Sequence, residues 1–178
     1  VNPLVLGSNP SGLTISRQAA LAPRSALPPR ARLPATAQHS PVAPRAVLFD
    51  AYGTLFDVYS VGLLAEQLFP GHGERLALLW REKQIDYTRL LTMSGRYKPF
   101  WEVTRAGLRY AAARLTLPLN EAAEERLMNQ YRHLSAFPEN REVLVELHRR
   151  GIGTGILSNG DPQMLGVAVK SAGLAELL

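Results

Sequence analysis

One aspartate stands at a position where α/β proteins often present a catalytic group. Asp50 directly follows the apolar run Ala46–Phe49, and Gly53 and Thr54 come shortly after it. A short, continuous apolar run predicts a strand that is buried on both faces of a parallel sheet. Because catalytic groups of open α/β sheets lie just past the carboxyl ends of such strands, Asp50 is a candidate nucleophile. Gly53 permits a backbone conformation that other residues resist, and the Thr54 hydroxyl can bond a nearby carboxylate oxygen.

A second polar cluster follows another predicted strand, Ile152–Leu157. Ser158, Asn159 and Gly160 form a predicted turn, and Asp161-Pro162 is suited to the N-cap and first position of a last helix, ending near Gly173. A hydroxyl, an amide and the free N–H groups of a helix start together make an anion site. Both clusters also have a plainer interpretation, because Asp, Asn, Ser and Gly are common in turns that bind nothing.

The chain between the two clusters is predicted to be helical from Val61 onward, because its apolar residues recur at steps of three, four and seven. A further helix is expected to begin at Pro138 and to end at Gly151. The residues of the predicted apolar faces are Leu76, Leu79, Trp80, Tyr87, Leu90 and Leu91 in one helix, Phe100, Thr104, Leu108, Ala111 and Leu115 in a second that follows Pro99, and Val143, Leu144 and Leu147 in the helix after Pro138. Asn120 is a candidate N-cap of another helix, with Glu121, Glu124 and Glu125 near its positive end.

Composition limits the classes of protein that the chain can belong to. Its 178 residues suffice for one domain with an inserted subdomain, and it has no cysteine, which excludes disulfides, thiolate metal sites and a cysteine nucleophile. No apolar stretch approaches the ~18 residues of a membrane span. We therefore expect no membrane partner. We also expect no metal site, because the four histidines, His39, His72, His133 and His148, share no metal-binding spacing.

The net charge of +5 arises in the first part of the chain, since no acidic residue precedes Asp50. Residues 1–44 are rich in Pro, Ala, Ser and Arg and are predicted to form an unfolded leader. They lack the apolar segment of a secretory signal, and an organelle transit peptide, a mis-assigned start and translated non-coding sequence stay open as explanations. The rest of the chain is close to neutral, so no nucleic-acid partner is expected.

The segment from Ala46 to Asp57 resembles motif I of the haloacid dehalogenase superfamily, in which the first Asp is a covalent nucleophile. Most members are phosphatases with a second Asp two positions on, where this chain has Tyr52. With a tyrosine at this position, the segment resembles motif I of the type II L-2-haloacid dehalogenases. The residues from Leu157 to Met164 resemble motif II of the same enzymes. The similarity continues through Leu79-Trp80-Arg81 and reaches from residue 46 to residue 178. It implies a Rossmann-like α/β core (45–61 and 136–178) with an inserted helical cap (62–135).

The resemblance also implies a reaction and a set of site residues. Asp50 would displace halide from the α-carbon of a short (S)-2-haloacid, and water would hydrolyse the aspartyl ester to the (R)-2-hydroxyacid. Arg81, helped by Asn159, would stabilise the departing halide, and Thr54 would orient Asp50. Ser158 and the backbone of Ala51 and Tyr52 would hold the substrate carboxylate, with Tyr52, Ile85 and Phe100 as the apolar wall. The family needs no metal or other cofactor, and we expect a cytoplasmic protein that can be a homodimer at full length.

The resemblance stops at Leu178, before the segment in which this family carries a lysine that helps to hold the nucleophile and before motif IV, and Lys170 is no substitute for that lysine. We therefore expect an incomplete sheet with an exposed strand edge, and a fragment or damaged gene product with little activity. Two alternatives stay open. One is a phosphatase-like member of the same superfamily in which Tyr52 is tolerated, and the other is an inactive remnant that associates through its exposed sheet edge.

Overall fold

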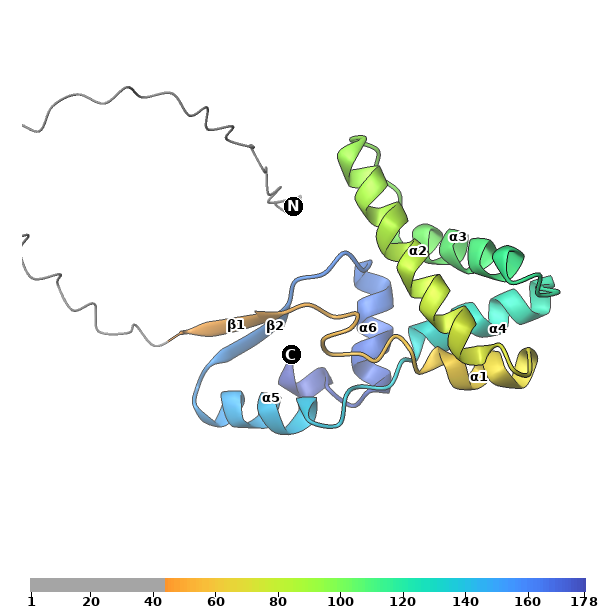
Figure 1. Ribbon diagram of the computed structural model, residues 1–178. Helices are drawn as coiled ribbons and strands as arrows, with labels where there is room; N and C mark the ends of the chain where they lie inside the picture. The colour runs from red at the N-terminus through yellow and green to blue at the C-terminus, as the bar shows by residue number, and fades with distance from the viewer. Residues whose placement is uncertain (1–43) are drawn as a thin grey trace, which may run out of the picture. The chain divides into compact units, whose positions relative to one another are not determined.

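The computed structural model describes residues 44–178. The predicted leader therefore lies outside the described residues, apart from Pro44. In chain order the described part contains β1 (Ala46–Phe49), α1 (Val61–Leu68), α2 (Gly73–Met93), α3 (Phe100–Arg114), α4 (Glu121–Arg132), α5 (Asn140–Arg149), β2 (Gly153–Ile156), α6 (Pro162–Ser171) and the short 3₁₀-helix η1 (Ala175–Leu177) (Figure 1).

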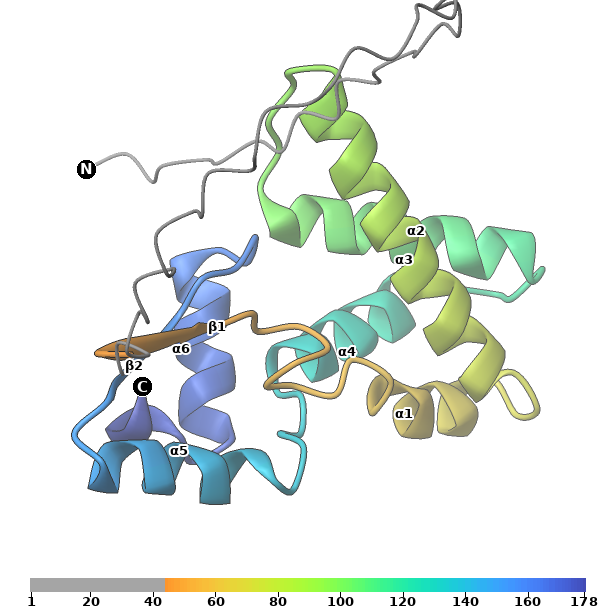
Figure 2. The ribbon, with the colours of Figure 1, turned by 60° about the vertical axis from the view of Figure 1, so that its left-hand side comes forward.

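The two strands form a parallel pair whose carboxyl ends meet at one edge of the sheet. Ala46 pairs with Gly153 and Phe49 with Ile156, and the Leu157 N–H donates to the Phe49 carbonyl at 2.9 Å. Figures 1 and 2 show β1 and β2 side by side, although the helices α1 to α5 lie between them in the chain. This register brings Asp50, just past β1, to the same edge as the turn that follows β2.

The prediction that β1 is buried on both faces is wrong for the described structure. Val47 and Phe49 are half-buried, whereas Ala46 and Leu48 are exposed, with 64% of Leu48 accessible. Alternating burial is the pattern of a sheet with one covered face. Within residues 44–178 β1 pairs with β2 alone, so its other edge has no neighbouring strand there.

The predicted helical stretch is confirmed as four helices, α1 to α4, that pack on one another (Figure 2). α2 contacts α1 and α3, and α4 contacts α1 and α3. Leu76 and Trp80 of α2 and Leu108 of α3 are almost completely buried. Gly107 lets α2 and α3 approach closely, because a Cβ there would lie 3.3 Å from the Trp80 ring. We call α1–α4 the helical unit and the remaining elements the α/β unit.

The predicted apolar face of α2 is only partly buried. Its first half packs into the core, but Leu90 is 59% exposed and Tyr87 is half-buried. The C-terminal end of α2 extends beyond α3 in both views (Figures 1 and 2), and Leu90 and Leu91 line an open groove with Val103 and Ala106 of α3. Periodicity therefore located the helix correctly but overestimated the length of its contact.

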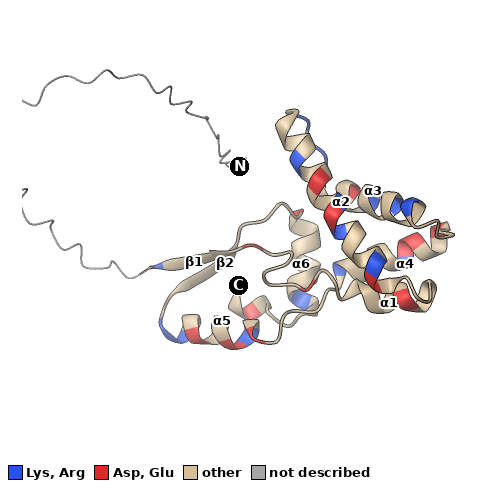
Figure 3. Ribbon diagram, in the orientation of Figure 1, with Lys and Arg blue, Asp and Glu red and all other residues tan. Residues whose placement is uncertain are grey.

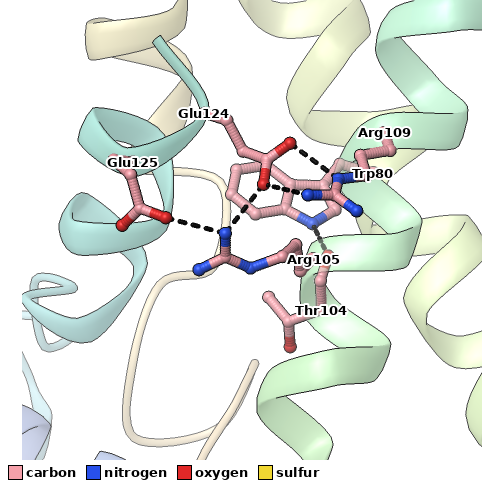
Figure 4. Close-up of polar contacts among 6 residues, drawn as sticks. All are labelled: Trp80, Thr104, Arg105, Arg109, Glu124 and Glu125. Carbon is pink, nitrogen blue, oxygen red and sulfur yellow. Dashed lines mark hydrogen bonds and ion pairs between the residues drawn. The ribbon is translucent and has the colours of Figure 1, made fainter. Parts of the chain in front are cut away.

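An ion-pair cluster joins α3 to α4 (Figure 4). Glu124 accepts from Arg109 Nε at 2.7 Å and from Arg105 Nη1 at 2.8 Å, and Arg105 also pairs with Glu125 at 2.7 Å. Asn120 is the N-cap of α4, as predicted, because its side chain accepts from the Ala123 N–H at 2.9 Å. We call Arg105, Arg109, Glu124 and Glu125 the α3–α4 clamp.

The last part of the chain follows the predicted order with shifted boundaries. α5 begins at Asn140 rather than Pro138, because Pro138 and Glu139 form a turn in which the Asn140 N–H donates to the Phe137 carbonyl. Leu144 is buried as predicted, but Val143 is 47% exposed. β2 is shorter than the predicted 152–157. α6 starts at Pro162, although the Asp161 side chain does not cap it.

Candidate active site

Asp50 emerges from the end of β1 into a tight turn. Asp50 is exposed, whereas Ala51 and Tyr52 are almost fully buried beneath it. The Ala51 carbonyl accepts from the N–H groups of Leu55 and Phe56, each at 2.9 Å, which closes the turn. Gly53 has φ +100°, as its position in the sequence predicted, because other residues rarely adopt this conformation. The turn therefore presents one carboxylate at its tip.

The turn after β2 packs directly against the turn after β1. The Gly160 N–H lies 3.3 Å from the Ser158 hydroxyl, and a Cβ at Gly160 would lie only 2.7 Å from Cε2 of Tyr52. A side chain at position 160 cannot fit without moving the Tyr52 ring. This close approach holds Ser158 and Asn159 beside Asp50.

α2 brings a cation to the same place. The Arg81 guanidinium donates from Nη2 to the Tyr52 carbonyl at 2.5 Å and from Nη1 to Gln84 Oε1 at 2.7 Å. A Cβ at Gly53 would lie 3.4 Å from Nη2, so the motif I turn and the guanidinium are in contact. Arg81 thus links the helical unit to the α/β unit at the predicted site.

These groups line one pocket with a volume of about 160 Å³. Seven of its lining residues were predicted from the sequence: Asp50, Tyr52, Arg81, Ile85, Phe100, Ser158 and Asn159. Three were not: Gln84, Thr88 and Arg89. The latter lie three, seven and eight positions after Arg81, so helical spacing from Arg81 could have found them.

Two predicted site residues do not line the pocket. Ala51 is fully buried beneath Asp50, where only its backbone is placed to take part. Thr54 is exposed, and its hydroxyl forms no hydrogen bond to Asp50 in the described structure. Its carbonyl instead accepts from the Asn140 side chain at 3.0 Å. The predicted contact between Thr54 and the nucleophile is therefore absent from residues 44–178 as they stand.

The aromatic side of the pocket holds neutral phenols. The Tyr52 ring lies 5.2 Å from the Phe100 ring and 5.7 Å from the Tyr131 ring, measured between centroids. Burial raises the pKa of Tyr52 above its usual range and raises that of Tyr131 to about 12. A phenol with a raised pKa is a poor proton donor to a leaving group, so Tyr52 is poorly suited to replace the general acid of the phosphatases.

The chemistry available at this pocket is nucleophilic attack with electrostatic help. A carboxylate is present at a strand end, and a guanidinium held from two sides faces the same space. Such a pair suits displacement of a group that leaves as an anion and needs no proton. Within the described residues no three His, Cys, Asp or Glu side chains are grouped so that they could hold a metal ion. None of the described helices is long and apolar enough to cross a membrane.

Comparison with known proteins defines the family of this fold and site. Residues 44–178 match the family model of the haloacid dehalogenase-like hydrolases, so the chain belongs to that family. It is 41% identical over 132 residues to the (S)-2-haloacid dehalogenase of Pseudomonas sp. (strain YL), covering 74% of this chain and 57% of that protein. The chain spans about half the length of the curated relatives it matches.

Solved structures agree. The crystal structure of the L-2-haloacid dehalogenase RSc1362 is 61% identical, with a TM-score of 0.74 over 77% of this chain and 62% of that one. The L-2-haloacid dehalogenase from Xanthobacter autotrophicus with chloropropionic acid covalently bound is 41% identical, with a TM-score of 0.71 over 76% and 54% of the two chains. The predicted fold class, an α/β haloacid dehalogenase fold with a small parallel sheet, is confirmed.

Proposed function

We propose that this protein catalyses the hydrolytic dehalogenation of short (S)-2-haloacids to (R)-2-hydroxyacids. The observation that carries the proposal is the convergence of Asp50, Arg81 and Asn159 on one small pocket. Support also comes from relatives named (S)-2-haloacid dehalogenase and from a similar structure with chloropropionic acid covalently bound. A volume of about 160 Å³ suits a substrate of a few non-hydrogen atoms.

The reaction has two steps that share one carboxylate. In the first, an Asp50 carboxylate oxygen attacks the α-carbon from the side opposite the halogen, a C–O bond forms, and the halide leaves with the electron pair of the C–halogen bond. In the second, water attacks the carbonyl carbon of the aspartyl ester, and the ester C–O bond breaks on the carbonyl side. The hydroxyacid leaves with inverted configuration, and the carboxylate is restored carrying one oxygen from water.

The other site residues take the roles that their positions favour. Arg81 and Asn159 stabilise the charge that grows on the departing halide, an interaction that strengthens toward the transition state. Ser158 and the backbone N–H groups of Ala51 and Tyr52 hold the substrate carboxylate. Ile85 and Phe100, with Tyr52, form the apolar wall around the substrate side chain.

The domain organisation belongs to the same proposal. Residues 62–135 act as a helical cap over a core made of residues 45–61 and 136–178. Arg81, Ile85 and Phe100 come from the cap, and Asp50, Ser158 and Asn159 come from the core. The substrate is enclosed between the two, which excludes water during the displacement step.

The test is halide release from (S)-2-chloropropionate by the complete gene product and by its Asp50→Asn variant. We expect release by the unsubstituted protein, a loss of at least about a thousandfold in the variant, and one heavy oxygen entering the Asp50 side chain in a single turnover in labelled water. Undiminished halide release by the Asp50→Asn variant would contradict the proposed nucleophile. Hydrolysis of p-nitrophenyl phosphate that depends on magnesium, without halide release, would favour the phosphatase alternative.

Three properties expected from the sequence stay predictions: the low activity of this chain alone, the homodimer and the cytoplasmic location. Comparing halide release by the 178-residue chain with that of the complete gene product tests the expected low activity of the chain alone. Sedimentation measures the expected homodimer, for which Leu90, Met93 and Tyr97 provide exposed apolar surface. The cytoplasmic location is checked by cell fractionation.

A further inference from the structure

Gln84 is a fully buried amide at the centre of a hydrogen-bond network beneath the pocket. Its side chain is 0% exposed, and it connects three helices of the helical unit. Oε1 accepts from Arg81 Nη1 at 2.7 Å and from the Tyr131 hydroxyl at 3.0 Å, while Nε2 donates to Thr104 Oγ1 at 2.6 Å. An amide buried among apolar residues is costly unless its polar atoms are all partnered, as they are here.

The orientation of this amide is fixed by its neighbours. The Thr104 hydroxyl donates to the Phe100 carbonyl at 2.8 Å, so it faces Gln84 as an acceptor. Nε2 must therefore point to Thr104, because only the amide nitrogen can donate. Oε1 is left facing Arg81 and Tyr131, both of which donate. A flipped amide would place the nitrogen against the Arg81 donor and the oxygen against the Thr104 oxygen, whose hydrogen is already donated to Phe100, so the network favours one arrangement.

Burial alone does not require a glutamine at this position. Leucine or methionine would fill a similar volume against the same neighbours without needing polar partners. What the glutamine adds is an acceptor placed against one edge of the Arg81 guanidinium. The Tyr52 carbonyl accepts from the other terminal nitrogen, so the planar group is held at two points that belong to different units of the protein.

We infer that Gln84 is a positioning residue that holds the Arg81 guanidinium in the orientation that stabilises the departing halide. The inference rests on the proposed function. Hydrogen bonds to Gln84 and to the Tyr52 carbonyl use two of the five N–H donors of Arg81, and the guanidinium group lines the pocket. A long side chain held in this way loses little further freedom when charge develops on the halide. The same network reaches the Phe100 carbonyl through the Thr104 hydroxyl, so it also fixes the position of the Arg81 guanidinium relative to Phe100 in the apolar wall.

This role predicts a dependence on the leaving group that a purely structural role does not. Smaller halides concentrate their charge and accept stronger hydrogen bonds, so chloride depends more on a correctly placed guanidinium than iodide does. In Gln84→Met we expect kcat for (S)-2-chloropropionate to fall about 10- to 100-fold, the scale of a small misplacement. The loss for (S)-2-iodopropionate should be at least about threefold smaller, which corresponds to a small part of one hydrogen bond.

Trp80→Phe is the matched structural control. The Trp80 indole donates from Nε1 to the Thr104 carbonyl at 2.7 Å in the same buried α2–α3 contact, but not to Arg81 (Figure 4). Its loss should lower thermal stability as Gln84→Met does, while leaving the chloride-to-iodide ratio of kcat unchanged. Thr104→Val keeps the shape of Thr104 and frees Nε2 of Gln84, so we expect a change in that ratio of the same sign and smaller size. This variant replaces Gln84→Met if the latter does not fold.

The experiment measures kcat for both substrates, together with the melting temperature, in the complete gene product and its variants. A ratio that changes in Gln84→Met and Thr104→Val but not in Trp80→Phe supports the inference. A ratio that changes in none of the three, with halide still released by the unsubstituted protein, overturns the inference and leaves the proposed function standing. No halide release by the unsubstituted protein overturns the proposed function first, and the positioning role falls with it.

Discussion

At Gly160 the turn after β2 leaves no space for a side chain. A Cβ there would meet Cε2 of Tyr52 at 2.7 Å and the Leu165 side chain at 3.2 Å. The Tyr52 ring cannot retreat freely, because it lies against Phe100 and Tyr131. We expect Gly160→Ala to lower the free energy of unfolding by about 1–3 kcal/mol, the usual cost of an overpacked contact, as measured by urea denaturation. It should also lower the rate of halide release, because Ser158 and Asn159 move with the turn.

Gly166 provides the same substitution with the opposite expected sign. It lies exposed within α6, and a Cβ there would meet nothing within 4 Å. Gly166→Ala should raise the free energy of unfolding by about 0.5–1 kcal/mol, because alanine favours the helix. Equal effects of the two substitutions would contradict the steric explanation for Gly160.

The sequence predicted the residues that line the pocket better than the contacts that hold those residues in place. Asp50, Arg81 and Asn159 could be found because each stands in a segment that resembles a motif of the dehalogenases, and all three line the pocket. Helical spacing from Arg81 points to Gln84, but its burial could not be predicted, because a glutamine in a helix is usually solvated and its partners Thr104 and Tyr131 lie 20 and 47 positions away. The predicted hydrogen bond from Thr54 to Asp50 is absent because a short polar side chain in a turn can point in several directions, and the sequence does not determine which one it takes.

Helices and strands could be placed from local pattern, but their burial could not. Periodicity located α2, α3 and α4, and the Asn120 cap fixed the start of α4. Burial depends on partners that a local pattern does not contain. Leu90 is exposed although it lines a groove with Val103 and Ala106 of α3, because that groove is open, and Leu48 is exposed because a single face of β1 is covered. Apolar spacing therefore predicts a face, and only the packed structure shows how much of it is used.

The α3–α4 clamp makes the stability of this helix pair depend on pH. Hydrogen bonds from Arg109 and then Arg105 lower the pKa of Glu124 from its ordinary value of 4.5, and only 10% of the Glu124 side chain is exposed. A carboxyl whose pKa is lower in the folded state stabilises the fold above its unfolded pKa, and this contribution is lost as the pH falls through the folded value. Glu124→Gln should lower the free energy of unfolding by about 1–2 kcal/mol at pH 7.

The difference between Glu124→Gln and the unsubstituted protein should shrink progressively as the pH falls below 4.5. Denaturation in urea at pH 7, 5, 4 and about 3 measures it. Glu121→Gln is the matched control, because Glu121 shares the first turn of α4 and its favourable dipole but has no ion pair within residues 44–178. A difference that stays constant with pH would show that the carboxylate of Glu124 is not the source of the stabilisation.

Both units of the described chain, the helical unit and the α/β unit, carry charges of both signs. The two units meet at the pocket. Figure 3 shows basic and acidic segments interspersed over the helices rather than gathered on one of them. The contacts that join the units include Arg81 with the Tyr52 carbonyl and the Tyr52 ring with Phe100 and Tyr131. The two residues of each of these contacts are far apart in sequence. The order of the motifs therefore predicted which residues lie near the site, but it did not predict which contacts hold the two units together.

Asp161 forms another of these contacts, and its position had predicted something different. Asp161 was expected to cap α6, and it occupies the N-cap position, but its side chain makes no capping bond there. Oδ2 instead accepts from the Trp101 N–H, 60 positions away, at 3.2 Å. The start of α3 needs such an acceptor, because Pro99 at its N-cap provides no side-chain bond. The α/β unit thus caps a helix of the helical unit directly beside Phe100.

Asp161→Ala should therefore loosen the start of α3 without disturbing α6. We expect amide hydrogen exchange at Trp101 to become about 5- to 30-fold faster and the free energy of unfolding to fall by about 1–2 kcal/mol, the usual loss for a removed N-cap. Exchange at Leu165 should stay unchanged, because its N–H donates to the Asp161 backbone carbonyl, which alanine retains. Asp161→Asn keeps an acceptor oxygen and should restore most of the protection at Trp101. If Trp101 exchanged equally fast in the unsubstituted protein and in Asp161→Ala, the carboxylate would not be what holds the start of α3, and the position of Phe100 against the Tyr52 ring would depend on aromatic packing alone.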